Sequence, residues 1–445
     1  MNRLNDNISV LLLAILSASS NLLFNITLSG LLPAYQYGDI IFSFNMVTLI
    51  ASLLIFGKGS LIYRYIPIYR DRKSPQQETQ LQNWYTVDLL KRSIILIVIF
   101  VVLKILITQP DKLPLNCLYI IDLLPVAILY SFLDILISHV GAAGYTKTRL
   151  LVWYSSTAVM LVFLLYTLKL FESSPPTSKI IYIYYIAYSS VIIFTLLVIK
   201  IQKIFPWGFT IKKRGHLEKK LRNKWEDHAK KFFQVNLLFS LSSYIGIFLI
   251  ETTSHIPRSI VSEAQVGYYC AIMSITGFVT ILDSFVYAES LSKISLINNS
   301  KKSKKAFNQL NSRASYFNMA YAIITTLIIY LFSKKLLLMF GEEFSSIQAP
   351  LMIVSITRVI LCATGLSAAI LSENGHQIIT RKIYIQCFFI YLILGLILCY
   401  LLGLLGLSMA YLTTSTYRCI RLRKYVKQLL EIKTGQMLLA LSFLN

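Results

Sequence analysis

Charged residues are scarce in this sequence. Asp, Glu, Lys and Arg make up 14% of its 445 residues, whereas 56% are hydrophobic and the mean hydropathy is +0.64. Soluble domains usually carry about 25% charged and about 45–50% apolar residues. These proportions exclude a water-soluble enzyme, a disordered chain, a collagen and a coiled coil. The composition is that of a protein that crosses a membrane many times.

The motifs of enzymes and metal sites are also missing. Six cysteines are scattered without a CxxC pair or a His/Cys cluster at metal-ligand spacing, so we expect no disulfide framework, no metal and no cofactor. No GxSxG, HExxH or P-loop sequence occurs. The loops predicted outside the cytoplasm are too short for a folded catalytic domain. The sequence therefore predicts a protein that is not an enzyme.

Long apolar segments dominate the chain instead. A helix needs about 20 apolar residues to cross a hydrocarbon core of about 30 Å. The first such segment is longer than the core of a signal peptide, so we expect it to be retained as a helix. The pattern predicts an all-α membrane protein with about twelve spans, at 8–31, 40–62, 93–108, 118–140, 150–168, 180–202, 232–250, 266–288, 314–332, 350–371, 383–400 and 405–423.

The excess of basic residues follows the predicted topology. The chain has 43 Lys and Arg against 20 Asp and Glu, a net charge of +23. When the loops are assigned alternately to two sides, 33 basic residues fall on one side and six on the other. The positive-inside rule then places both termini in the cytoplasm. The positive charge is a signal of topology, and nucleic acid is not expected as a partner.

The two halves of the chain repeat. Tyr37-Gly38 begins the second predicted span, and Val266-Gly267 begins the eighth, 229 residues later. Gly144-Tyr145 after the fourth span and Gly375-His376 after the tenth repeat at an offset of 231. Two independent landmarks with nearly the same offset predict two parallel six-helix bundles. Parallel repeats are typical of transporters that rock two halves about a central site.

The repeat predicts how the chain is divided. A basic amphipathic segment, His216–Lys231, is expected to lie on the anionic inner leaflet, with Trp225 on its apolar side. The predicted parts are an N-terminal bundle at 1–202, a cytoplasmic basic linker at 203–231, a C-terminal bundle at 232–428 and an interfacial tail at 429–445.

Three basic residues inside predicted spans are candidates for binding an anionic substrate. Arg358 lies near the middle of the tenth span, where it either lines a polar cavity or pairs with an acid on another helix. Lys58 lies between two glycines near the cytoplasmic end of the second span. Its side chain either snorkels to the headgroups or is approached by an anionic ligand. Lys104, near the outer end of the third span, has the same two interpretations.

Two acidic residues inside spans are candidates for ion coupling. Asp134 in the fourth span and Asp283 in the eighth either couple transport to protons or cations, or pair with Arg358 and Lys58.

Tyrosines crowd the outer end of the sixth span and are interpreted as an interfacial aromatic belt, with stacking on sugar rings as the alternative: Tyr182, Tyr184, Tyr185 and Tyr188.

Four short segments begin or follow predicted spans in a familiar order: Leu32-Pro33-Ala34-Tyr35-Gln36-Tyr37-Gly38, Ala264-Gln265-Val266-Gly267-Tyr268-Tyr269, Phe340-Gly341-Glu342-Glu343-Phe344, and Gly403-Leu404-Leu405-Gly406-Leu407-Ser408-Met409-Ala410. Together they resemble polysaccharide flippases of the O-antigen exporter type. The resemblance covers nearly the whole chain in spacing and topology, although each motif is short.

The resemblance implies membership of the multidrug/oligosaccharidyl-lipid/polysaccharide exporter (MOP) superfamily and a MATE-like fold. Such proteins flip an undecaprenyl-diphosphate-linked oligosaccharide across the bacterial inner membrane for lipopolysaccharide and other surface polysaccharides. The expected partners are that lipid-linked oligosaccharide, membrane lipids and other polysaccharide-assembly proteins. Helices one, two, seven and eight would line the cavity, with Lys58 and Asp283 in it. Similar proteins often carry an acid where this chain has His255, so no coupling role is transferred to that position.

Two other functions compete with the flippase interpretation. A cation-coupled small-molecule exporter of the MATE type would share the fold and favour acids in its cavity. A membrane-embedded polysaccharide polymerase or glycosyltransferase would need a large outer loop with catalytic residues, which the predicted loops do not provide.

The topology is open to a direct test. Reporter fusions at Gln77, Lys220 and Ser303 should indicate a cytoplasmic location, and one at Ser174 a periplasmic location, because these positions fall in loops on opposite sides. The activity of an alkaline phosphatase or a green fluorescent reporter at each position measures this. A periplasmic signal at Lys220 would contradict the twelve-span arrangement.

Overall fold

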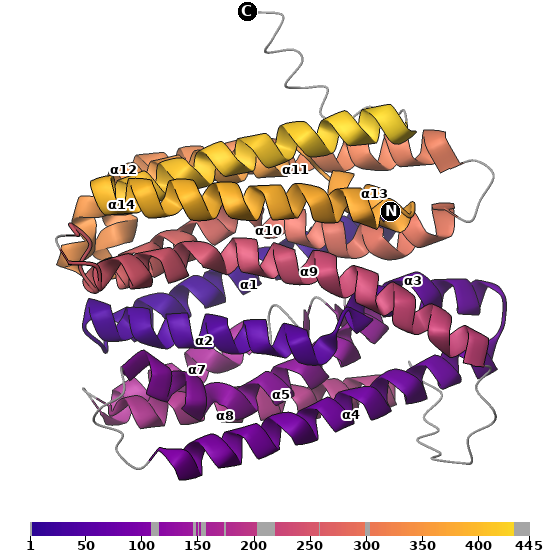
Figure 1. The fold of residues 1–445 in the computed structure, drawn as a ribbon, viewed down its shortest axis with the longest axis horizontal. Helices are drawn as coiled ribbons and strands as arrows, with labels where there is room; N and C mark the ends of the chain where they lie inside the picture. The colour runs from indigo at the N-terminus through magenta and orange to yellow at the C-terminus, as the bar shows by residue number, and fades with distance from the viewer. Residues whose placement is uncertain are drawn as a thin grey trace, which may run out of the picture.

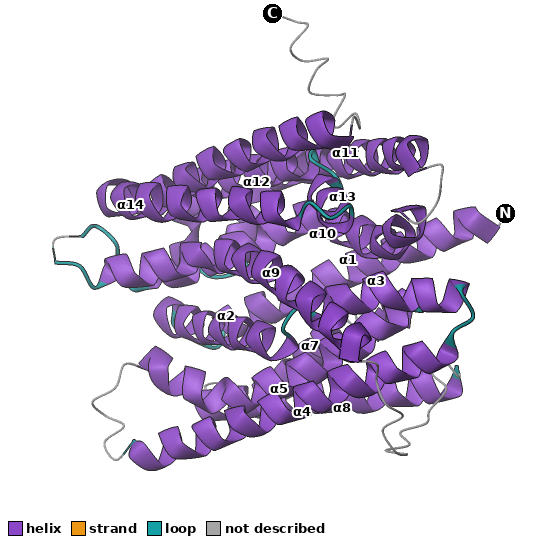
Figure 2. Ribbon diagram, turned by 45° about the vertical axis from the view of Figure 1, so that its right-hand side comes forward, coloured by secondary structure: helices purple, strands orange, loops and turns teal. Residues whose placement is uncertain are grey.

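The computed structural model consists of helices. It describes residues 2–107, 115–145, 148–149, 151–152, 157–172, 175–202, 219–257, 259–298 and 303–430, and within these ranges no strand occurs (Figure 2). In a bilayer core, water is absent and backbone amides must be satisfied within the protein, which a helix does by itself. The apolar segments therefore fold as helices, as their composition predicts.

The helices run roughly side by side in two groups (Figure 1). One group contains α1 (Asn2–Ser29), α2 (Ala34–Ile55), α3 (Lys58–Asp71), α4 (Pro75–Leu106), α5 (Leu115–Ala142), α7 (Thr157–Phe171) and α8 (Thr177–Ile201). The other contains α9 (Lys219–Ser254), α10 (Ala264–Asn298), α11 (Ser303–Leu338), the 3₁₀ helix η3 (Glu342–Ile347), α12 (Gln348–Cys362), α13 (Ser367–Glu373) and α14 (Gln377–Leu430). The contact between the groups is formed mainly by α1, α2 and α3 on one side and by α9 and α10 on the other.

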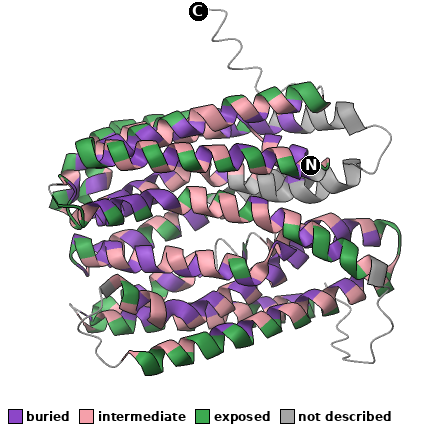
Figure 3. Ribbon diagram, in the orientation of Figure 1, coloured by how far each residue is buried: buried purple, intermediate pink, exposed green. Residues whose placement is uncertain are grey.

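Eight of the described helices are long and apolar enough to cross a membrane. Large apolar side chains also cover the outer edge of α4, which is not one of these eight (Figure 3): Ile94 is 60% and Ile105 70% exposed. Such side chains suit contact with lipid tails. The last two predicted spans are the two helices of α14, which are joined by a kink at Gly403, where the backbone adopts the non-helical φ +58°. A glycine tolerates this conformation without steric cost.

The second predicted span is broken into two helices. Phe56 (φ +48°) and Gly57 (φ +72°) both adopt the left-handed conformation between α2 and α3. At Gly57 a Cβ atom would lie 2.3 Å from the carbonyl oxygen of Ala229 on α9. Only glycine permits both the backbone conformation and this close approach of the two groups. The tenth predicted span is divided similarly, into α12 and α13.

The orientation toward the membrane that the sequence predicts for the apolar side of the basic segment before the seventh span is wrong for Trp225. Residues 219–231 are the first turns of α9, and Trp225 is fully buried rather than facing a membrane. Its indole Nε1 donates to the hydroxyl of Tyr69 on α3 at 2.9 Å. His228, one turn later, shares a 2.8 Å hydrogen bond with Tyr65. Helix α9 thus reaches across to the other group (Figure 1), whereas 203–218 and the tail from 431 lie outside the described residues.

Candidate functional site

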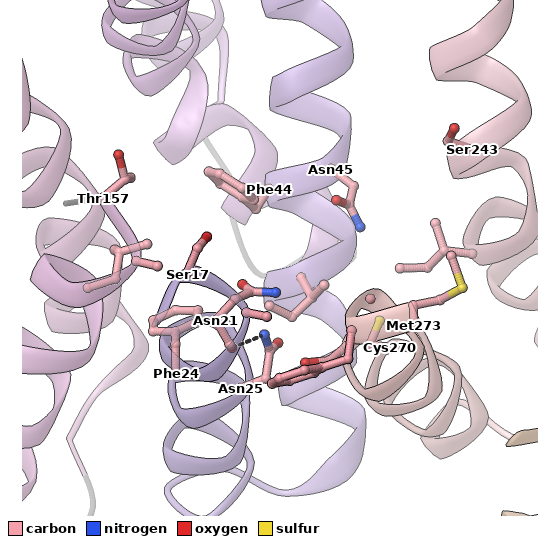
Figure 4. Close-up of a pocket in the computed structure, with 18 of the residues that line it drawn as sticks. Ser17, Asn21, Phe24, Asn25, Phe44, Asn45, Thr157, Ser243, Cys270 and Met273 are labelled. Carbon is pink, nitrogen blue, oxygen red and sulfur yellow. Dashed lines mark hydrogen bonds between the residues drawn. The ribbon is translucent and has the colours of Figure 1, made fainter. Parts of the chain in front are cut away.

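A cavity of about 480 Å³ lies between the two groups of helices. Its wall is formed by α1, α2, α7 and α8 on one side and by α9 and α10 on the other (Figure 4). Four of these helices, α1, α2, α9 and α10, are the ones that the family resemblance implies. The polar residues that line the cavity are Ser17, Asn21, Asn25, Asn45, Thr157, Tyr184, Tyr188, Ser243, Tyr244, Tyr269 and Ser274.

The cavity wall carries no formal charge among the described residues. No Asp, Glu, Lys or Arg belongs to the lining. The polar groups are amides and hydroxyls, which both donate and accept hydrogen bonds. Aromatic and aliphatic side chains such as Phe24, Phe44 and Ile247 fill the spaces between them. The cavity therefore suits a neutral ligand with many hydroxyl or amide groups.

Helix α1 contributes its polar face to the cavity through regular spacing. Ser17, Asn21 and Asn25 follow one another at intervals of four residues, so they lie on one side of the helix. The Asn25 amide donates to the carbonyl oxygen of Asn21 at 2.8 Å, shown as a dashed line in Figure 4. Its Oδ1 atom accepts a 3.0 Å hydrogen bond from the Tyr37 hydroxyl. These contacts hold the amide in place at the wall.

Sequence reasoning missed this asparagine face because it weighed only ionisable groups. The signal was present: three asparagines inside the first two predicted spans, where unpaired amides are costly.

The aromatic-belt interpretation is wrong for two of the four tyrosines near the sixth span. Tyr184 and Tyr188 are 1% and 4% exposed and line the cavity, whereas Tyr182 is 63% exposed at the surface.

Arg358 lies beside the cavity but does not line it. Its Nη2 atom is 3.5 Å from the sulfur of Met273, which belongs to the cavity wall. The guanidinium carbon is 5.7 Å from the centre of the Tyr411 ring. Its buried Nε atom has no hydrogen-bond partner, and no described acid forms an ion pair with it. A thioether is a weak acceptor, so this guanidinium keeps unused donor capacity one side chain away from the cavity.

Lys58 is engaged in a structural contact. Its ammonium is fully buried and lies 2.5 Å from Asp88 on α4, and it also approaches the carbonyl of Leu54 at 3.5 Å. Arg92 shares Asp88 at 2.8 Å, reaches the carbonyl of Leu53 at 3.4 Å and lies 4.2 Å over the ring of Phe56. The break between α2 and α3 leaves the carbonyl groups of Leu53 and Leu54 without helical hydrogen-bond donors. The side chains of Arg92 and Lys58 donate to these two carbonyls instead. Lys58 does not line the described cavity.

The other three predicted site residues also lie outside the cavity wall. Lys104 pairs with Asp122 in a partly exposed ion pair near the ends of α4 and α5. Asp283 accepts a 2.7 Å hydrogen bond from the Asn318 amide of α11. Asp134 lies near Gly59 of α3, where a Cβ atom would be 3.4 Å from its carboxylate. Neither Asp134 nor Asp283 forms an ion pair with a described residue. Their predicted roles in binding and coupling stay predictions.

The contact between Lys58 and Asp88 generates a testable prediction. Asp88→Ala leaves the buried Lys58 ammonium without its carboxylate, whereas Lys58→Ala leaves Asp88 paired with Arg92. We therefore expect a lower amount of protein in the membrane for both variants, with the larger loss for Asp88→Ala. The double variant should restore much of that amount. Quantitative immunoblots of membrane fractions measure it, with Lys231→Ala in an exposed pair as the control. If Lys58→Ala accumulates normally but loses transport, Lys58 acts on the substrate and not on the fold.

The comparisons with known proteins agree on the fold. No known protein family matches the sequence, and no curated protein is similar to it in sequence. Solved structures do match over 95% of the chain. The Vibrio cholerae MATE transporter VcmN in its bent form has a TM-score of 0.62 at 18% identity, with 98% of that chain covered. An inward-facing multidrug resistance MATE family transporter of the MOP superfamily has a TM-score of 0.66 at 14% identity, also with 98% covered.

A third match is a MOP superfamily transporter from Pyrococcus furiosus, with a TM-score of 0.65, 13% identity and 95% of that chain covered. The description of that protein states that a reversed polarity of its binding pocket suggests a different function. Proteins of one fold can thus differ in the polarity of the binding pocket. The predicted all-α, multi-span architecture is confirmed, and the chain has the fold of the MATE transporters of the MOP superfamily.

Proposed function

We propose that this protein is a flippase that moves a lipid-linked oligosaccharide across the membrane by alternating access. The observation that carries the proposal is the neutral, amide- and hydroxyl-lined cavity between the two groups of helices. Sugar hydroxyls find donors and acceptors there, and no fixed charge in the described wall would attract a cationic drug. The prenyl chain of such a substrate would stay in lipid.

The diphosphate of the substrate requires a cation close to this cavity. Of the three basic residues predicted from the sequence, Arg358 is the one whose side chain contacts the cavity wall, through Met273. A guanidinium binds phosphate oxygens through two parallel hydrogen bonds, which a lysine cannot reproduce. We therefore assign Arg358 to the diphosphate. Lys58 and Lys104 are held by Asp88 and Asp122 and would have to leave these partners to bind it.

A cation-coupled small-molecule exporter is the second candidate. It is favoured by the partly buried carboxylates of Asp134 and Asp283, neither of which forms an ion pair with a described residue, and by the fold shared with multidrug MATE transporters. In that function the two acids would bind the coupling ion. The same acids would serve a flippase driven by an ion gradient, so they do not separate the two candidates, whereas the ligand of the cavity does.

A reconstituted assay separates the two functions. In proteoliposomes, we expect the protein to make undecaprenyl-diphosphate-linked oligosaccharide accessible to an external lectin, and to give no ion-gradient-driven efflux of ethidium. Asn21→Leu should reduce lectin accessibility about tenfold, because an apolar wall leaves sugar hydroxyls unpaired. Thr27→Val, on the same helix but outside the cavity lining, is the control. Ethidium efflux without lectin accessibility would establish the exporter instead.

The assignment of Arg358 is tested by substitution. We expect Arg358→Ala to abolish lectin accessibility without lowering the amount of protein in the membrane, because no described acid depends on this residue for its charge. Arg358→Lys should retain part of the activity, since a lysine supplies a point charge without the bidentate geometry. The control is Arg222→Ala, at an exposed ion pair. Normal flipping by a well-expressed Arg358→Ala protein would contradict the assignment.

A further inference from the structure

The two groups of helices touch backbone to backbone at one end of the cavity. At Gly38 of α2, a Cβ atom would lie 2.7 Å from the amide nitrogen of Gly267 on α10. At Gly267, a Cβ atom would lie 2.2 Å from the carbonyl oxygen of Ala34. A Cβ atom does not come that close to a backbone nitrogen or oxygen, so no side chain fits at either position. The two glycines of the first repeat landmark, Gly38 and Gly267, are thus in contact with each other.

This crossing closes the cavity toward the loops between α1 and α2 and between α9 and α10. Going away from these loops, the next residues that line the cavity are Ile41 on α2 and Tyr269 on α10, three and two residues beyond their glycines. The same end of the bundle is the one that the distribution of basic residues places outside the cytoplasm. The crossing therefore separates the cavity from the predicted outer side.

Aromatic side chains cover the crossing. Phe344 of η3 has its ring 5.0 Å from that of Tyr268, 5.7 Å from that of Phe340 and 6.5 Å from that of Tyr37, between ring centres. Tyr37, Phe340 and Phe344 are all at most 2% exposed. Tyr37 belongs to α2, whereas the other three rings belong to the second group. Contacts of this kind stabilise the closed arrangement and would be lost if the two groups separated here.

One hydrogen bond connects this cover to the cavity. The Tyr37 hydroxyl donates to Oδ1 of Asn25, and Asn25 lines the cavity. A ligand hydroxyl that donates to the same Oδ1 atom would share this acceptor with Tyr37. Occupation of the cavity would then weaken the attachment of the α2 ring that holds the aromatic cover in place.

We propose that the Gly38–Gly267 crossing and its aromatic cover are the outer gate of transport, and that the Tyr37–Asn25 hydrogen bond couples opening of this gate to the presence of ligand. The proposed gate depends on the proposed transport function in one respect: the transported substrate must leave through it. Opening itself is measured without any substrate, so failure of the gate and failure of the flippase function are distinguishable.

The chain contains its own reporter for this gate. Cys270 is a free thiol, 5% exposed, in the cavity wall directly beneath the crossing. Cys117 is an exposed free thiol at the start of α5, on the predicted outer side. In intact spheroplasts, a membrane-impermeant maleimide should label Cys117 in the native protein, and this signal verifies the sidedness. In a Cys117→Ser background, we expect labelling to fall to background because the gate shields Cys270.

Two substitutions should open the gate in that background. Gly267→Val places a side chain into the crossing and should raise labelling of Cys270, whereas Gly277→Val, on the same helix with no atom within 4 Å of its Cβ position, should not. Tyr37→Phe removes only the hydroxyl and should raise labelling about fivefold, the effect of losing one hydrogen bond on a two-state equilibrium. Tyr35→Phe, with an exposed ring, is its control.

The outcomes decide the proposal as follows. Increased labelling of the Gly267→Val or Tyr37→Phe protein, with both controls at background, supports the gate. Strong labelling of Cys270 before either substitution overturns it, because the crossing would then not seal the cavity. If Gly267→Val does not accumulate in the membrane, Tyr37→Phe decides alone, since it adds no atoms. A well-expressed Tyr37→Phe protein that stays unlabelled overturns the proposed coupling.

Discussion

The hydrocarbon core of a membrane offers no hydrogen-bond partners, and the rest of this structure depends on that constraint. Where the chain is helical, the backbone satisfies itself. Where the helix breaks at Phe56 and Gly57, the side chains of Lys58 and Arg92 approach the freed carbonyls of Leu54 and Leu53, and Asp88 holds both cations in position. Charge inside the N-terminal half is thus used to stabilise a bend that the fold requires.

The same constraint explains why the cavity is neutral. Several charged side chains outside the cavity are paired with one another, as Lys58 is with Asp88 and Lys104 with Asp122, whereas Arg358, Asp134 and Asp283 form no ion pair with a described residue. The cavity wall keeps amides and hydroxyls, which cost less than charges where contact with water is intermittent. Such a wall binds many weak donors and acceptors at once and releases them without breaking an ion pair. That property suits a substrate that must be bound on one side and released on the other.

Glycines allow the two groups of helices to approach closely at two points, one near each end of α2. Near its start, Gly38 contacts Gly267; just after its end, Gly57 contacts the backbone of Ala229. Close backbone approach through small residues is a common way for helices to associate in a membrane, where apolar side chains gain little by leaving lipid. Contacts made by a few small residues bury little surface, so they can separate at modest cost. The proposed alternating-access transport requires that kind of reversible contact.

The sequence by itself determined the all-α membrane architecture, because a run of about 20 apolar residues has one stable form in a bilayer. It also located Gly38 and Gly267, the two glycines of the first repeat landmark, which meet at the crossing. It also identified Arg358 as a deep cation. The tertiary structure alone decided which polar groups share a cavity: Asn21 and Asn25 on α1 come together with Tyr184, Tyr188 and Ser243 through packing between helices distant in the chain. It likewise decided that Lys58 is paired with Asp88 and that Trp225 is buried, since a side chain's partners depend on which helix faces it, and local sequence does not specify that neighbour.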